Sequence, residues 1–346
     1  MRFALVVTLL FSALTAFAHV DPNGHDYAVS APSASQMERL AAEFEVLRKT
    51  AGGFEFYVPH AKLARFRALA PRSSKLPVSA AKASDLAQYR NYESVSAELQ
   101  ELANQYPRLA KLETYGTTRS GHVLYALKIS DNVTVDENEP ELMLTSATHG
   151  DELVTVEVMM QLVRELLAGH GRDTRLSRLI NERELWVLPM VNPQGYSRRT
   201  RYANGFTDPN RDYPYPDKPD VESVDCIDLL RKFFHAHDFK GSLDVHASGR
   251  MVMYPWAYTE RAPEAADVVD FEHLVNSMAE QNGYAAGQIS KVIYVAKGSS
   301  ADYYYWKNRT KAIAVELTTS KVPPIARVPA VVDEAREMVW RFIENF

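Results

Sequence analysis

Strand-like and helix-like segments alternate along the chain from residue 89 to its end. Apolar runs typical of strands lie at 109–114, 123–129, 141–147, 185–191, 241–245 and 311–317. Helical periodicity appears at 94–106, 153–167, 227–234 and 331–344. This alternation favours an α/β fold, and we expect a mixed, largely parallel twisted sheet flanked by helices.

The first 18 residues have the features of a signal peptide. Arg2 supplies a positive charge, an apolar run covers 3–11, and Ala16-Phe17-Ala18 forms a cleavage site. We expect cleavage after Ala18 and a mature protein that is secreted or periplasmic. The apolar run is too short to span a bilayer, and no later stretch reaches ~18 consecutive apolar residues, so we expect no stable membrane insertion.

Residues 19–71 are predicted to form a small α/β appendage. A helical pattern covers 36–50, a strand pattern 54–58 and a second helical pattern 61–69. Residues 72–88 are rich in Ser, Ala and Lys, which is typical of an exposed linker. The remaining residues, 89–346, suffice for one large catalytic domain.

Composition excludes some classes of partner. The formal charge is -5 at pH 7 and no block of Lys and Arg stands out, which argues against nucleic acid. Cys226 is the only cysteine, so an exported chain would have no internal disulfide and would depend on its core for stability. We expect Cys226 to be a buried apolar filler rather than a nucleophile, and we expect a monomer.

Two histidines and a carboxylate stand just after predicted strands. His149 and Glu152 follow the run 141–147, and His246 follows 241–245. Open α/β sheets place their sites at the carboxyl ends of strands. Two imidazoles and one carboxylate suit a catalytic zinc, which leaves a fourth position open for a water that becomes acidic near neutral pH. The pattern therefore predicts a metal-dependent hydrolase.

Further motifs follow in order over most of residues 89–346. They are Tyr92-Glu93-Ser94, Asn104-Gln105-Tyr106-Pro107, Asn192-Pro193-Gln194-Gly195-Tyr196, Asp208-Pro209-Asn210-Arg211-Asp212, Met253-Tyr254-Pro255-Trp256, Ile293-Tyr294 and Glu316. Together with His149, Glu152 and His246, this ordered set resembles the zinc metallocarboxypeptidases of the funnelin type.

The resemblance implies a role for each motif. His149, Glu152 and His246 would bind one Zn2+ per chain, and Asp208 would hold a ligand imidazole through its other ring nitrogen. Residues Asn210 and Arg211 would grip the terminal carboxylate of a peptide, which an Arg guanidinium can bind with two hydrogen bonds. Arg201, rather than the nearby Arg199, would polarise the scissile carbonyl and stabilise the oxyanion.

Glu316 is an acid inside an apolar strand, where an isolated charge would be costly to bury. A site carboxylate facing a metal-bound water explains it, and its role would be that of general base and then proton donor. By the same resemblance, Tyr294 would cover bound substrate.

The specificity pocket carried over from the family is small and apolar. It comprises Ile289, Ile293, Ala296, Ala301 and Ala314. Because no acid stands at its base, we expect release of small apolar or aromatic residues rather than of Lys or Arg. Arg250 and Lys297 leave open an acidic or diaminopimelate-type group.

Two features depart from the family pattern. Asp151 stands where animal digestive members carry a basic residue that contacts longer substrates, so the outer subsites should differ. Residues 19–71 loosely resemble the family's inhibitory pro-segment but look shorter, and an inhibitory role for them stays open.

The leading hypothesis is an exported zinc carboxypeptidase whose partners are the C-termini of peptides or proteins. One alternative keeps the fold and the metal but cuts peptidoglycan stem peptides. A second is a zinc amidohydrolase acting on acyl amino acids, and a third is a non-catalytic binding module. A serine or cysteine hydrolase is disfavoured, because the sequence has no G-x-S-x-G motif.

Overall fold

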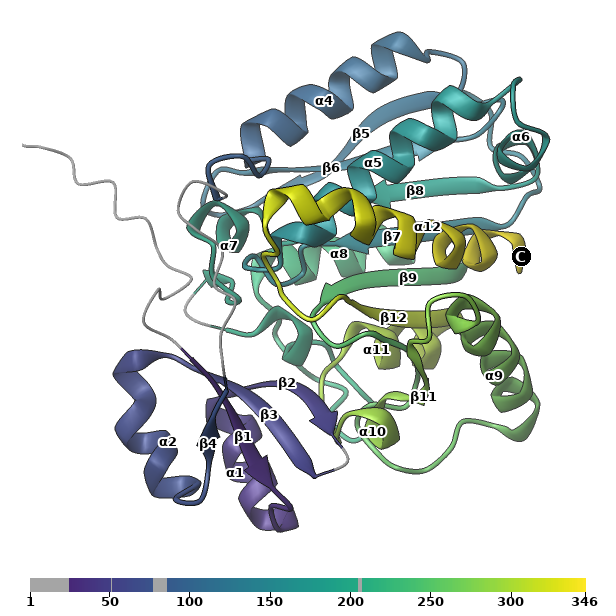
Figure 1. The fold of residues 1–346 in the computed structure, drawn as a ribbon. Coiled ribbons are helices and arrows are strands. Elements are labelled where there is room, and N and C mark those ends of the chain that lie inside the picture. The colour runs from purple at the N-terminus through teal and green to yellow at the C-terminus, as the bar shows by residue number, and fades with distance from the viewer. Residues whose placement is uncertain (1–24, 51, 77–85, 205–206) are drawn as a thin grey trace, which may run out of the picture.

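The computed structural model describes residues 25–50, 52–76, 86–204 and 207–346 (Figure 1). The predicted signal peptide, 1–18, and residues 77–85 of the predicted linker lie outside this part of the chain. Within it, no helix combines the length and the apolar character needed to cross a membrane.

The N-terminal unit is a four-stranded antiparallel sheet with helices packed against it. Its strands are β1 (His25–Ser30), β2 (Glu45–Thr50), β3 (Gly53–Val58) and β4 (Ser74–Lys75), in the order β2-β3-β1-β4. Its helices are α1 (Ala34–Glu43), the 3-10 turn η1 (His60–Lys62) and α2 (Leu63–Leu69). The core between the two layers contains Tyr27, Val29, Leu40, Phe44, Phe56, Val58, Phe66 and Ala70.

Three sequence expectations for this unit were wrong. The helix expected over 36–50 ends at Glu43, because Phe44 adopts an extended backbone and the next residues pair with β3 instead. Residues 25–30, for which the sequence predicts neither a helix nor a strand, form the strand β1 between β3 and β4. Strand β4 lies inside the segment predicted as a linker, so the sheet extends into it.

The large unit is built on an eight-stranded sheet in the order β11-β10-β12-β9-β7-β8-β6-β5. Its strands are β5 (Ala110–Thr117), β6 (Val123–Ile129), β7 (Glu141–Ser146), β8 (Glu184–Leu188), β9 (Phe239–Ala247), β10 (Met251–Tyr254), β11 (Ala285–Gln288) and β12 (Lys311–Leu317). The central strands β8, β7, β9 and β12 are parallel, while β5, β6 and β10 each pair antiparallel with a neighbour. The predicted mixed, largely parallel α/β sheet is therefore confirmed.

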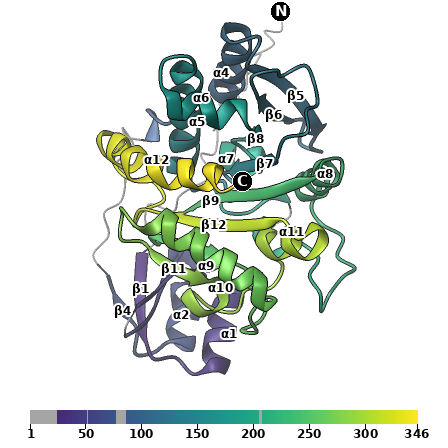
Figure 2. The same cartoon turned by 90° about the vertical axis from the view of Figure 1, so that its right-hand side faces the viewer.

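Helices cover both faces of this sheet. They are α4 (Tyr92–Gln105), α5 (Leu153–Gly169), α6 (Thr174–Asn181), α7 (Pro193–Arg198), α8 (Asp225–His235), α9 (Ala265–Ala279), α10 (Ile289–Val292), α11 (Ser300–Asn308) and α12 (Val328–Glu344), with 3-10 turns η3 (Pro209–Arg211) and η4 (Ile325–Arg327). Figure 2 shows α5 and α12 on one side of the central strands and α8 and α11 on the other. Cys226 is buried in α8, as expected.

The period-two alternation of the strands decides what faces the site. Along β12, Ile313 and Val315 belong to the core under α5 and α12, whereas Ala312 and Ala314 belong to the core on the opposite face. Because Glu316 continues the second series, its side chain emerges on the same face as Ala314.

Candidate metal centre and active site

Three buried side chains converge at the carboxyl ends of β7 and β9. His149 lies on the turn between β7 and α5, Glu152 stands immediately before α5, and His246 lies near the end of β9. His149 Nδ1 is 2.8 Å from Glu152 Oε1, and His246 Nδ1 is 3.1 Å from Glu152 Oε2. The two Nδ1 atoms are 3.1 Å apart. All three residues are at most 3% exposed, so the structure brings together the predicted ligand set.

The turn that carries His149 is pressed against α7. A Cβ built on Gly150 would lie 2.0 Å from the carbonyl carbon of Gly195. Only glycine permits this approach, so Gly150 allows His149 and Glu152 to face His246 across the turn.

The outer ring nitrogens of both histidines face carboxylates. His149 Nε2 is 3.1 Å from Asp208 Oδ1, and His246 Nε2 is 3.0 Å from Asp244 Oδ2. If each Nε2 carries a proton and donates it to its carboxylate, both Nδ1 lone pairs point at Glu152. Such a cluster of acceptors fits a cation between them, and this arrangement of a ligating imidazole with a carboxylate behind it is common in zinc sites.

The charges around the cluster also favour a cation. Burial alone would lower the pKa of His246, but the Asp244 and Glu152 carboxylates raise it well above its ordinary value. Burial would likewise raise the pKa of Glu152, yet His149 and His246 hold it well below the usual range. The carboxylates around the imidazoles therefore favour a positive charge at the ring nitrogens, which either a proton or a metal ion would supply.

Asp244 was not singled out from the sequence. Its buried carboxylate also accepts hydrogen bonds from Thr145, Thr148 and Ser300. An available signal was its position two residues before His246 in an apolar strand, which places both side chains on one face.

Glu316 stands beside His246 in the parallel pairing of β12 with β9. Its Oε2 atom is buried and has no hydrogen-bond partner within the described residues. Burial, and second the charge of Glu152, raise the pKa of Glu316 to about 8. An unpaired carboxylate oxygen beside the histidines is the arrangement that a base facing a water would need.

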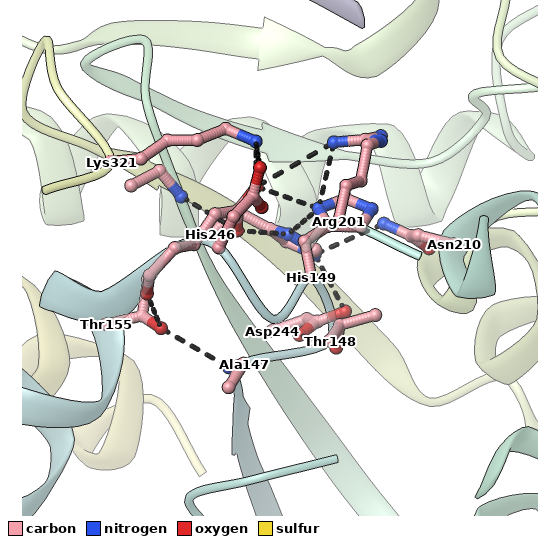
Figure 3. A network of polar contacts seen from close by, with 12 residues as sticks. Ala147, Thr148, His149, Thr155, Arg201, Asn210, Asp244, His246 and Lys321 are labelled. Carbon is pink, nitrogen blue, oxygen red and sulfur yellow. Dashed lines mark hydrogen bonds and ion pairs between the residues drawn. The ribbon is translucent and has the colours of Figure 1, made fainter. Parts of the chain in front are cut away.

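Arg201 follows α7 and reaches the cluster, whereas Arg199 does not. Arg201 Nε donates to Asp208 Oδ2 at 2.9 Å, and Nη1 is 3.1 Å from His149 Nδ1. Arg199 instead donates to the Leu86 carbonyl. Figure 3 shows the Arg201 guanidinium next to His149 and Asn210.

Asn210 and Arg211 lie on the 3-10 turn η3. Asn210 Oδ1 accepts from the Ser300 backbone N–H at 2.8 Å, and its Nδ2 is 3.1 Å from His246 Nε2. The Arg211 guanidinium donates to Tyr294 Oη at 2.5 Å and lies 5.7 Å from the centre of that ring. The predicted residues Asn210, Arg211 and Tyr294 thus border one cavity together with Glu316.

The rest of the cavity is mostly apolar. Its lining includes all five residues predicted for the pocket, Ile289, Ile293, Ala296, Ala301 and Ala314, together with Met253 and Ala257. Arg250 is ion-paired with Glu334, and neither Arg250 nor Lys297 lines the cavity. Among the described residues, the apolar part of the cavity therefore carries no acid that would bind a basic side chain. Neither Arg250 nor Lys297 is placed to bind an acidic one.

A buried acid behind the pocket holds one of its walls. The Asp302 carboxylate accepts from the backbone N–H groups of Ala257 at 2.7 Å and Tyr258 at 2.8 Å. Burial raises its pKa to about 7, although both hydrogen bonds oppose that rise.

The N-terminal unit contributes two residues to this cavity that sequence analysis did not single out. Glu45 and Val46, at the start of β2, line it. Glu45 Oε1 accepts from Arg201 Nη1 at 3.2 Å and pairs with Lys321 Nζ at 2.5 Å. Lys321 also pairs with Asp151 Oδ2 at 2.8 Å. Because 45–50 was expected to be helical, no pattern pointed to Glu45, and Lys321 has no local signal at all.

Comparison with known families gives one extended match. A family model described as zinc carboxypeptidase matches residues 95–338. Among curated relatives, a zinc carboxypeptidase of Saccharothrix mutabilis subsp. capreolus is 26% identical over 275 residues, covering 68% of this chain and 63% of the relative. Bovine carboxypeptidase B is 25% identical over 256 residues, covering 63% and 60%. The chain thus spans less than two thirds of the length of these relatives.

Solved structures share the fold. Carboxypeptidase A from Helicoverpa armigera superposes with a TM-score of 0.79 at 20% identity, covering 93% of this chain and 97% of that one. Thrombin-activatable fibrinolysis inhibitor gives a TM-score of 0.73 at 15% identity, covering 93% and 98%. At these identities the likeness concerns the fold alone.

Proposed function

The chain belongs to the zinc carboxypeptidase family, and from this premise we propose that it is an exported, zinc-dependent hydrolase that removes the C-terminal residue of peptides. One observation carries the proposal. The His149–Glu152–His246 cluster and the Arg211 guanidinium border the cavity together with Glu316 Oε2, which has no hydrogen-bond partner in the described part of the chain.

His149, Glu152 and His246 would hold one Zn2+, with Asp208 and Asp244 fixing the two rings. When bound, zinc supplies Lewis acidity, which polarises a carbonyl and makes water nucleophilic near neutral pH. Glu316 Oε2 would take a proton from the attacking water and later give it to the leaving amine. Arg201 would stabilise the negative charge that develops on the carbonyl oxygen.

Arg211, with Asn210 and Tyr294, would bind the free carboxylate of the C-terminal residue. The side chain of that residue would enter the apolar part of the cavity, where Ile293 and Ala301 lie. Because this part is apolar and small, it suits small apolar or aromatic residues.

The N-terminal unit would act as an inhibitory pro-segment in the uncut chain. Its residues Glu45 and Val46 line the cavity. Lys49, on the same strand β2, donates through Nζ to the Lys291 carbonyl at 3.2 Å. A substrate would have to displace them. Cleavage in the segment 72–88, which contains Arg72, Lys75 and Lys82, would release the unit.

The test is mass spectrometry of a peptide library incubated with the zinc-loaded chain, before and after limited trypsin treatment. We expect stepwise, chelator-sensitive loss of C-terminal residues after the cut, and little loss from amidated copies of the same peptides. Cleavage confined to cell-wall stem peptides would instead indicate a role in cell-wall remodelling. Cleavage of acyl amino acids alone would favour an amidohydrolase, and no cleavage at all would contradict the enzyme assignment.

A further inference from the structure

Lys321 is a mostly buried cation beside the cavity, where it pairs with Glu45, one of the lining residues. It follows β12 by a short loop, and only 14% of its side chain is exposed. Its ammonium pairs with Asp151 of the same unit and with Glu45 of the N-terminal unit, and it lies 3.7 Å from Glu152 Oε1. Figure 3 shows its Nζ on the same side of the cluster as the Arg201 guanidinium.

Arg201 and Lys321 share one carboxylate oxygen. Glu45 Oε1 pairs with both Arg201 Nη1 and Lys321 Nζ. Asp151 belongs to the large unit and would keep Lys321 in place without the N-terminal unit. Removing Glu45 would therefore leave two partly buried cations with an empty acceptor position between them. Charge-assisted hydrogen bonds of this kind are stronger than neutral ones.

The placement of Glu45 and Val46 indicates which part of a substrate would bind between Arg201 and Lys321. Glu45 contacts the two cations, and the next residue, Val46, packs against the apolar core that includes the pocket wall. In a bound peptide, the C-terminal residue would occupy the apolar pocket near Arg211. The residue before it would lie on the other side of the scissile bond, toward Arg201.

We propose that Lys321, held by Asp151, forms with Arg201 a carboxylate-binding subsite for the side chain of the penultimate residue of a substrate. This rests on the carboxypeptidase function proposed above and adds a preference that the apolar pocket cannot supply. The group that this subsite would recognise is a carboxylate next to the scissile bond. It could belong to Glu or Asp of an ordinary peptide or to diaminopimelate of a stem peptide.

The test uses paired peptides that differ only in a penultimate Glu or Gln, with the same apolar C-terminal residue. The enzyme is the zinc-loaded full chain cut by limited trypsin. We expect kcat/KM for the Glu peptide to exceed that for the Gln peptide roughly tenfold at low salt, with a smaller ratio at high salt. A third peptide with penultimate diaminopimelate identifies which source of the carboxylate is preferred.

Lys321→Gln should reduce the Glu/Gln ratio to about one. Because that change leaves Asp151 unpaired, the double variant Asp151→Asn/Lys321→Gln provides a second test in which the pair is neutral, and it should also give a ratio near one. Lys297→Gln, an exposed lysine outside the cavity, should keep the wild-type ratio. A wild-type ratio near one, or an unchanged ratio in both Lys321 variants, would overturn the subsite while leaving the carboxypeptidase function intact. Inactivity on all peptides would instead overturn the function itself.

Discussion

Arg201 and Glu45 stand 156 residues apart in the chain, yet Arg201 Nη1 donates to Glu45 Oε1 at 3.2 Å. The pair joins the guanidinium beside His149 to the first strand residue after α1. Through it, and through Lys321, the N-terminal unit places a carboxylate at the entrance of the cavity that holds the candidate metal ligands.

Glu45→Gln should raise the activity of the uncut chain about tenfold, because it removes a charge-assisted contact that holds the N-terminal unit over the cavity. Initial rates on one peptide, measured without trypsin, test this. Glu43→Gln is the matched control, since Glu43 pairs with Arg65 inside the N-terminal unit. Equal rates for wild type and Glu45→Gln, with normal activation by trypsin, would exclude this contact as an inhibitory one.

Glu316→Gln should lower kcat by about 10²–10⁴-fold, the usual contribution of a general base. Zinc content, measured by atomic emission, should stay at one ion per chain, because Glu316 is not among the three converging ligands. Near-normal turnover in a metal-loaded variant would show that another group accepts the proton.

Arg211→Ala should reduce kcat/KM for peptides with a free C-terminus by roughly 10- to 100-fold, the range expected for hydrogen bonds to a charged group. Amidated copies, which lack the carboxylate, should lose far less. Arg211→Lys should restore activity only in part, because an ammonium cannot form the two-bond contact. Equal losses on both kinds of peptide would argue against an exopeptidase.

Chelation should abolish activity and lower the melting temperature, and added Zn2+ should reverse both effects. A ligand present at 1,000 times its Kd stabilises the folded state by ~4 kcal/mol, which corresponds to several degrees. Differential scanning calorimetry with and without chelator measures the shift. His246→Ala should show little chelator-dependent shift, and a shift as large as that of wild type would place the metal elsewhere.

Asp302 should make the free energy of unfolding depend on pH. Its pKa is about 7 in the folded protein against a reference of 3.8, so between pH 4 and 7 the folded state keeps a proton that the unfolded state has lost. Rising pH therefore lowers the stability of wild type across this window, by up to about 4 kcal/mol. Below pH 4 and above pH 7 this contribution is constant.

Asp302→Asn cannot titrate, so its free energy of unfolding relative to wild type should rise from pH 4 to pH 7. Urea unfolding at several pH values measures the difference, and this difference cancels the titration of all other groups. Parallel stability curves for the two proteins would mean that Asp302 is ionised throughout.

The strands of the large unit and the candidate metal ligands could be predicted from local patterns and ordered motifs. Local periodicity predicted the strand 123–129 and the strand 311–317 at the observed bounds, because strand and helix patterns are set by neighbouring residues. The ordered motifs likewise predicted that His149, Glu152 and His246 would lie together, since parallel strands bring their carboxyl ends to one edge.

The entrance to the cavity could not be predicted in this way, because it depends on contacts between segments far apart in the chain. Residues 45–50 have helical periodicity but form a strand, because pairing with β3 outweighs a weak local preference. Lys321 and Glu45 are ordinary charged residues in the sequence. Their ion pair arises because folding places a loop of the large unit against a strand of the N-terminal unit, and no local pattern encodes a contact between such distant segments.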